Sequence, residues 1–482
     1  MDTFEQHYFK ALGLIIFLLA VIVLQTAMNR GFSIDEFEHI HSAWYIRQGY
    51  TPYSDFFQHH HPLLWCLLLP FLHVFGHSAD ILLILRFFMF LMTLGIALLI
   101  YLVTGRLVAA GPISSDKPMR QSKEAGLLSV VFLLSTVMFV VFGIQIRPDI
   151  PQVLFGLLSL YFLIRFFGEK KNSYMVFTGF SASISFLFLQ KTIFLLIAYG
   201  IIFVYKLLRR EISFKPVLFF SISFLAPLSL FLFYLFFSGS MNDYILTNWL
   251  LNMNFARDDS FSLFLTLNYY ILKDLLLWLF SFLFFLSLVR NRKKTAGVVN
   301  ITAFICLVLL ATLFLIKRPW GHNFLFPLSL LSILAGYYLH HIILKFRLNA
   351  AYRVLIPVLI LLSSGYFLLE RCKNTNRAEI ERANFVIQNS TESDLVYDGK
   401  NRFNLFRPDL HYFWFSLKKS HGLDTYNRLT NNRFGDYDIR RLIKTKKPKF
   451  ISDFRIDIKK CGLNTLYRKT PYENLYIRID PK

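Results

Sequence analysis

The sequence predicts a polytopic α-helical membrane protein with about eleven transmembrane helices and a small C-terminal α/β domain. Of the 482 residues, 55% are hydrophobic, including 54 Phe, and the mean hydropathy is +0.47. Apolar runs of about twenty residues, long enough to cross a bilayer, recur along the first three quarters of the chain. After about residue 370 the composition becomes that of a soluble domain.

Eleven apolar segments are predicted to span the membrane. They cover about residues 11–28, 81–103, 125–144, 150–167, 174–189, 192–208, 217–237, 263–289, 298–316, 324–344 and 354–369. Lys10 precedes the first span and no small-residue cleavage pattern follows it, so this span is expected to be a signal anchor. Residues 62–76 form an apolar segment that is short for a helix crossing the bilayer, which favours a re-entrant or interfacial helix.

The basic residues predict the orientation. The formal net charge is +22, and Lys and Arg cluster after the even-numbered spans. Because cytoplasmic loops of membrane proteins are rich in Lys and Arg, this pattern places those loops and the N-terminus in the cytoplasm and explains the charge without a nucleic-acid partner. The first loop, about residues 29–78, and everything after the last span are then expected outside.

The C-terminal region, residues 371–482, reads as a separate soluble domain following the membrane domain of residues 1–370. Helical patterns begin at Arg377 and cover 438–446, and strands are predicted at 394–398, 449–452 and 475–479. Cys372 and Cys461 both fall in this region and are candidates for a disulfide if it faces an oxidising compartment.

Four polar clusters are predicted on the outer side. They are the loop around residues 33–65, Arg147-Pro148-Asp149, Gln190-Lys191, and residues 317–323 with Arg318 and His322. The first is the richest and contains four carboxylates, Asp35, Glu36, Glu38 and Asp55, together with five histidines. Because desolvation of charged groups near a membrane is costly, such residues generally have a function. The structural alternative is that polar residues in these short turns only anchor the helices at the interface between membrane and water.

The residue types indicate an enzyme that acts on a lipid phosphate. A carboxylate held at the end of the first span, such as Asp35, is suited to act as a general base toward a hydroxyl, and Asp149 is expected to approach from the second loop. Lys191 and Arg318 provide positive charge for a phosphate leaving group. Carboxylates together with histidine also allow a divalent metal ion or a shared proton network.

Several of these residues have structural alternatives. Glu36 and Glu38 are equally suited to cap a helix, and Asp55 is either functional or an N-cap. Three consecutive histidines, His59, His60 and His61, cannot all face one ion, so a single ligand or substrate contact is expected among them.

The first loop resembles a known family. The Asp35-Glu36 pair, followed by H-x-x-x-A-W-Y-I-x-x-G-x-x-P-Y-x-D-F-F-x-H-H-x-P-L from His39 to Leu63, is similar to the C-type (GT-C) membrane glycosyltransferases. The branch in question holds the protein O-mannosyltransferases and the aminoarabinose transferase acting on lipid A. The later outer loops are similar over shorter stretches.

This resemblance implies a polyprenyl-phosphate sugar as donor, inversion at the sugar carbon, and a lipid, polysaccharide or protein acceptor at the outer face of a bacterial inner membrane. It also implies that Asp35 is the base, that Lys191 and Arg318 hold the phosphate, and that Asp149 corresponds to the second acidic position of the family. The residues themselves suggest further candidates: Glu36 for catalysis, Arg147 for donor phosphate binding, and Asp55, His60, His61 and His322 for substrate contacts or helix caps. Members of the family differ in their use of metal ions, so the resemblance is compatible both with a bound divalent metal ion and with its absence.

Two other classes compete with this interpretation. A transporter or lipid flippase would place ionisable residues near span midpoints and at broken helices, whereas here they gather at span ends. Another membrane transferase, either an acyltransferase or a sugar-polymer ligase, is disfavoured only by the resemblance of the first loop.

Overall fold

The computed structural model describes residues 3–111, 118–254, 268–269, 271–290, 297–316, 320–400, 402–412, 423–433, 438–454 and 456–479. The chain divides into two compact units. Unit 1 comprises Met1–Arg30, Arg86–Leu230 and Asp258–Lys373, and unit 2 comprises Gly31–Leu85, Phe231–Arg257 and Asn374–Lys482.

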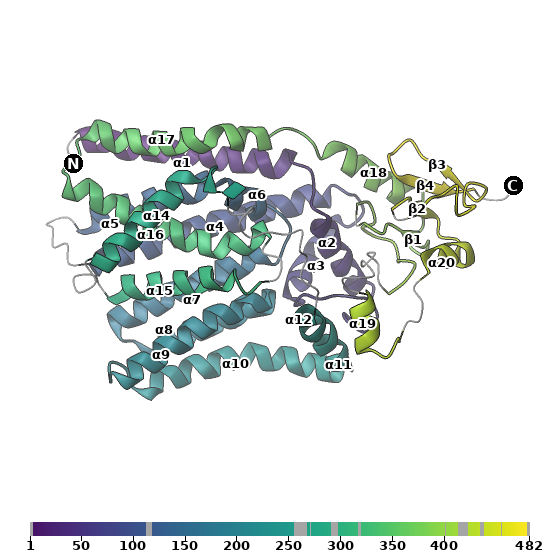
Figure 1. Cartoon of the computed structure of the whole chain (residues 1–482), viewed down its shortest axis with the longest axis horizontal. Coiled ribbons are helices and arrows are strands. Elements are labelled where there is room, and N and C mark those ends of the chain that lie inside the picture. The colour runs from purple at the N-terminus through teal and green to yellow at the C-terminus, as the bar shows by residue number, and fades with distance from the viewer. Residues whose placement is uncertain are drawn as a thin grey trace. The chain divides into compact units, whose positions relative to one another are not determined.

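Unit 1 consists of helices, of which α1 and α17 lie side by side (Figure 1). Its elements are α1 (Thr3–Asn29), α4 (Ile81–Ala109), α5 (Pro118–Ser135), α6 (Val137–Gly143), α7 (Asp149–Glu169), α8 (Asn172–Phe188), η1 (Gln190–Thr192), α9 (Ile193–Leu208), α10 (Phe214–Phe237), α14 (Leu275–Arg290), α15 (Gly297–Thr312), η4 (Gly321–Phe324), α16 (Leu325–Lys345) and α17 (Ala350–Arg371). The first residues of α4 and the last of α10 belong to unit 2.

These helices confirm a polytopic helical membrane protein. Among the described residues, seven helices are long and apolar enough to cross a membrane, or up to eight when the bent pair α5 and α6 counts as one span. Helices occupy all eleven predicted positions, but α8, α14 and α15 have only 17, 16 and 16 residues. The first residues of the predicted span 263–289 lie outside the described residues. The count of eleven therefore stays a prediction.

The predicted span 125–144 is not one straight helix. The α5 and α6 axes differ by 72° at a break beside Thr136. The buried carboxylate of Asp274 accepts hydrogen bonds from the backbone N–H groups of Val137, at 2.6 Å, and Met138, at 3.3 Å. These N–H groups would otherwise bond to the preceding helical turn, so the carboxylate replaces the helix bonds lost at the bend.

Small residues allow the inner helices to pack closely. Gly336 of α16 lies so near α5 that a Cβ atom there would fall 2.1 Å from the Ser129 hydroxyl oxygen. Ser129 in turn accepts a hydrogen bond from Thr104 of α4 at 3.0 Å. Glycine and hydroxyl-bearing residues at such contacts are typical of helices that pack inside a membrane.

Unit 2 combines short helices with a small sheet. Its elements are α2 (Ile34–Arg47), α3 (Leu63–Phe75), α11 (Met241–Tyr244), the π-helix η2 (Ile245–Leu251), α12 (Asn252–Asn254), α18 (Arg377–Gln388), β1 (Val396–Tyr397), α19 (Leu423–Leu429), α20 (Ile439–Lys446), β2 (Phe450–Ser452), β3 (Tyr467–Lys469) and β4 (Leu475–Arg478). Helix α3 occupies the apolar segment that was expected to form a short, non-spanning helix.

The sheet has the strand order β1-β2-β4-β3. Strands β1 and β2 are parallel, with Val396 opposite Phe450, and the other two pairs are antiparallel. Phe450 and Leu475 pack with Val386 of α18 in one apolar cluster. The structure has helices and strands at each position predicted for this region, and β3 is an additional strand.

The two units divide the chain differently from the predicted boundary at residue 370. The C-terminal segment forms one unit with the first loop. Two hydrogen bonds between them run from the Phe32 backbone N–H to Glu379 and from the Gly31 backbone N–H to Thr375, both at 2.7 Å. The four cysteines are all free, and Cys372 belongs to unit 1 whereas Cys461 belongs to unit 2.

Candidate functional site

Unit 1 brings together residues from three of the four predicted outer clusters. The Asp149 carboxylate contacts two cations: its Oδ2 atom accepts a hydrogen bond from Arg147 Nε at 3.2 Å, and its Oδ1 atom lies 3.5 Å from Lys191 Nζ. Lys191 Nζ also donates to the side-chain oxygen of Asn323. Arg147 and Asp149 are buried, at 5% and 2% exposed. Residues distant in sequence therefore form one charged cluster, hereafter the Asp149 cluster.

The Asp149 cluster lies where three helices begin. Asp149 opens α7, Lys191 lies in η1 just before α9, and Asn323 lies in η4 just before α16. The free N–H groups at a helix N-terminus carry partial positive charge, which favours an anion. With two cations against one carboxylate, the cluster has a net positive charge and is suited to hold a phosphate group.

A close backbone contact holds the third of these helix starts in place. At Gly321, the first residue of η4, a Cβ atom would fall 2.1 Å from the Phe142 ring of α6. A side chain at this position would require the Phe142 ring to shift, so glycine allows the close approach. The following residues are His322 and Asn323, of which Asn323 contacts Lys191 in the Asp149 cluster. His322 lines a small cavity with Asp149 and Lys191. Arg318, predicted to bind the phosphate, lies outside the described residues.

In unit 2 the predicted base lies at the start of α2. Ser33 is the N-cap, and the Ser33 backbone N–H donates to Glu36 Oε1 at 2.8 Å, which completes a capping box. Asp35 is half-buried in the first helical turn. Glu36 therefore caps the helix, which was one of its two expected roles. The catalytic roles of Asp35 and Glu36 stay predictions.

Two other residues of the first loop have structural contacts. Asp55 is exposed and accepts the Thr51 backbone N–H at 2.6 Å, so it holds a turn and is not the helix N-cap that the structural alternative expected. His61 is buried, with its Nε2 atom 3.0 Å from the Tyr244 hydroxyl. Their predicted substrate contacts are not tested by these bonds.

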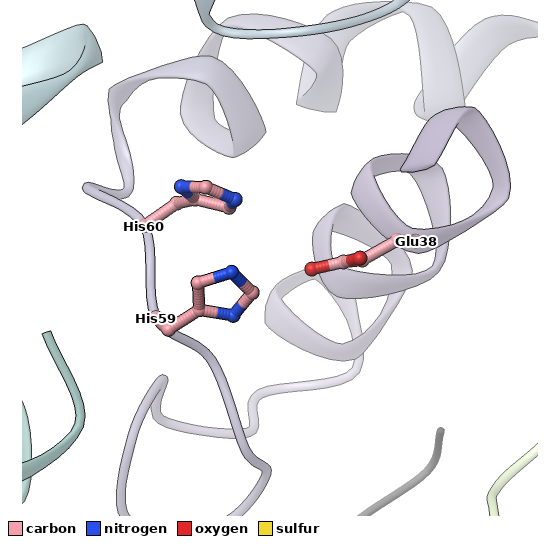
Figure 2. Close-up of side chains that lie close together, drawn as sticks. All are labelled: Glu38, His59 and His60. Carbon is pink, nitrogen blue, oxygen red and sulfur yellow. The ribbon is translucent and has the colours of Figure 1, made fainter. Parts of the chain in front are cut away.

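Glu38, His59 and His60 form the second cluster, hereafter the Glu38 cluster. Figure 2 shows the Glu38 carboxylate, from α2, pointing toward the two imidazoles on the neighbouring loop. One ligand atom from each residue lies within 4.8 Å of the others, a spacing that suits a metal ion. Burial raises the pKa of Glu38 to about 7, an effect only partly opposed by a hydrogen bond from Gln58 Nε2 at 3.1 Å.

The sequence interpretation missed parts of this arrangement. It expected one histidine of the triplet as a ligand or substrate contact, and this stays a prediction; in the structure His59 and His60 both lie near Glu38, and His61 contacts Tyr244. It also connected His41 with no partner, but His41 Nε2 lies 2.6 Å from Asp409 Oδ2 and Nδ1 lies 3.1 Å from the Leu405 carbonyl oxygen. Asp409 is 368 residues away, and no sequence signal connects the two.

Comparison with solved structures defines the class. The structure of ArnT from Cupriavidus metallidurans bound to undecaprenyl phosphate matches with a TM-score of 0.63 at 14% identity, covering 96% of this chain and 97% of that one. The oligosaccharyltransferase of Archaeoglobus fulgidus, tethered to an acceptor peptide, matches with a TM-score of 0.52 at 11% identity, covering 91% of this chain and 68% of that one. The chain therefore has the fold of the C-type (GT-C) membrane glycosyltransferases.

A match to a protein family supports the same class. Residues 59–237 match the family described as dolichyl-phosphate-mannose-protein mannosyltransferase. No curated protein sequence matches the chain. The resemblance predicted from the first loop is thus confirmed at the level of the class.

Proposed function

We propose that this protein transfers a sugar from a polyprenyl-phosphate donor to an acceptor at the outer face of the membrane. The observation that carries the proposal is the Asp149 cluster, where Arg147 and Lys191 meet at the N-termini of three helices. A solved protein of the same fold holds undecaprenyl phosphate, the kind of lipid phosphate that such a cluster would bind.

In the proposed reaction, an acceptor hydroxyl attacks the anomeric carbon of the donor while the bond from that carbon to the phosphate oxygen breaks. The new glycosidic bond forms on the opposite face, so the configuration inverts. Asp35 takes the proton of the hydroxyl, and the polyprenyl phosphate leaves as an anion. Lys191 and Arg147 stabilise its charge, and Asp149 holds these two cations in position. A phosphate leaving group needs no general acid, so one base suffices.

The direct test is an assay with the purified full-length protein, a synthetic polyprenyl-phosphate sugar and acceptor material extracted from the envelope. Mass spectrometry of the products should show the sugar on the acceptor and free polyprenyl phosphate. Movement of the donor across vesicle membranes without any transfer would contradict the proposal and support a flippase.

We further propose that the Glu38 cluster holds a divalent cation of the zinc class. One carboxylate oxygen and two imidazole nitrogens form a mixed set typical of zinc, and a site with three protein ligands keeps a position open for water or substrate. Gln58, which donates to both Glu38 and the Ser42 hydroxyl oxygen at 2.8 Å, would orient the carboxylate.

Protein purified without chelators is expected to contain about one zinc-class ion per chain, measured by plasma mass spectrometry. The double substitution His59→Ala with His60→Ala should remove most of that metal because two of the three ligands are lost. His73→Ala, which removes an exposed histidine of α3 in the same unit, should leave the metal content unchanged. Equal metal in the double variant and the wild type would exclude this site.

The orientation has its own test. Thr430→Cys, in a cysteine-free background, should react with an impermeant thiol reagent in intact spheroplasts because the C-terminal region is proposed to lie outside. Lys171→Cys, at an exposed position in a loop proposed to be cytoplasmic, should react only after lysis. The opposite pattern would overturn the predicted topology.

A further inference from the structure

A cavity of about 410 Å³ lies within the C-terminal segment of unit 2. It opens beyond the carboxyl ends of the parallel strands β1 and β2: Asp398 directly follows β1, and Asp453 and Phe454 directly follow β2. Helix α18 contributes Glu379 and Arg382 to the wall. The carboxyl ends of parallel strands are a common position for ligand sites, and the volume is within the range of such sites.

Asp398 is built into this cavity. It is 2% exposed, and its Oδ2 atom accepts three backbone N–H bonds, from residues 402, 403 and 404, at 2.7, 2.7 and 2.9 Å. Its other oxygen, Oδ1, is buried and accepts no hydrogen bond from any described residue. A buried carboxylate oxygen without a donor is costly, so this position calls for a ligand hydroxyl or amine.

Arg382, another residue of the cavity wall, has an unsatisfied donor. Its Nη2 atom donates to the Arg402 carbonyl oxygen at 3.1 Å. Its Nε atom is buried and donates to no described residue. The cavity wall therefore offers one unsatisfied acceptor and one unsatisfied donor, a pair that a group carrying several hydroxyls would satisfy together.

The charges of the wall argue against a phosphate ligand. The wall contains three cations and four carboxylates. The cations are Arg382, Lys400 and Arg402, and the carboxylates are Glu379, Asp398, Asp453 and Glu473. One of the cations is already paired, since Arg402 Nη1 lies 3.0 Å from Glu379 Oε1. A wall without excess positive charge does not favour a strongly anionic ligand. The rings of Phe454 and Tyr472 supply apolar surface beside the polar groups.

We propose that this cavity binds a neutral or amino-bearing sugar of the acceptor glycan. Mixed donors and acceptors with aromatic surface match the hydroxyls and the apolar C–H faces of a pyranose ring. The inference rests on the proposed function in one respect, that the bound sugar belongs to the acceptor. Binding of the sugar itself does not depend on the chemistry of the donor. Binding and transfer can therefore be measured separately.

The test is binding of the full-length protein in detergent to immobilised neutral and amino-sugar oligosaccharides, without donor. Wild type should bind at least one of these probes. Asp398→Asn should weaken binding at least tenfold: asparagine keeps one oxygen for the three backbone N–H groups but replaces the free oxygen with an NH₂ donor. Its matched control is Asp394→Asn, which alters another turn-holding carboxylate, outside the cavity, and should leave binding unchanged.

Arg382→Ala covers the case in which Asp398→Asn fails to fold. It should also weaken binding at least tenfold, whereas Arg377→Ala, at an exposed position of the same helix, should not. Absence of binding by wild type, or unchanged binding in both cavity variants, would overturn the proposal. Lys191→Ala should bind the oligosaccharides normally, so loss of transfer with retained glycan binding points to the donor site and leaves the cavity proposal intact.

Discussion

Asp35→Asn is expected to lower sugar transfer by a factor of about 100 or more while the protein still inserts and folds. Asparagine has the shape and hydrogen-bonding capacity of aspartate but does not accept the proton of the attacking hydroxyl as a carboxylate does. The start of α2 should survive the change because Ser33 and Glu36, not the Asp35 side chain, form the capping box.

Turnover with a polyprenyl-phosphate sugar and donor binding should be measured side by side. The matched control is the neighbouring Glu36→Gln, which keeps a side-chain acceptor for the Ser33 N–H and should cost stability of at most about 1 kcal/mol, with a smaller effect on turnover. Near-normal turnover by Asp35→Asn would move the base to Asp149 or Asp55. Loss of donor binding together with turnover would indicate a binding role instead.

Lys191→Ala should weaken use of the donor about 30-fold, corresponding to about 2 kcal/mol, the scale of losing a charge-assisted contact in a poorly solvated site. The substitution also removes one of the two cations that contact the buried Asp149 carboxylate. Arg318→Ala is expected to act in the same direction, and Arg318→Lys to restore it only in part because a lysine does not bind two phosphate oxygens in the arginine geometry.

Lys206→Ala provides the control, since it removes a lysine near the C-terminal end of α9, the helix that follows η1, and Lys206 there pairs with Glu211. Donor binding and the KM for the polyprenyl-phosphate sugar should change in Lys191→Ala and not in Lys206→Ala. Equal donor affinity in both variants would show that Lys191 only anchors α9 at the membrane interface.

The sequence predicted the positions of the helices well because each apolar run is a local signal. It also placed Arg147, Asp149 and Lys191 in short connections on one side of the membrane, from the distribution of basic residues. That these three side chains contact one another is seen only in the structure. The bend at Thr136 escaped prediction because its cause, Asp274, is 136 to 137 residues away from the backbone groups that it caps.

The Glu38 cluster was predicted only in outline. The sequence placed carboxylates and histidines in one loop, but which of them meet depends on how residues 59–61 turn against α2. His61 does not join the group: its Nε2 atom lies 3.0 Å from the hydroxyl of Tyr244, which comes from a distant segment. The cavity beside Asp398 had no sequence signal at all, since its wall combines α18, the end of β1 and the end of β2.

The assembly of unit 2 from three separate stretches of chain constrains how the protein is made. The loop carrying Asp35 is synthesised early, yet Glu379, which holds the Phe32 backbone, follows 347 residues later. At about 5–20 residues per second, the ribosome needs on the order of 17–70 s to supply it. During that interval α2, with its buried glutamates and histidines, lacks part of the surface that covers it. Nascent chains are thus without a finished first loop until translation is nearly over, which withholds the proposed active site from incomplete proteins.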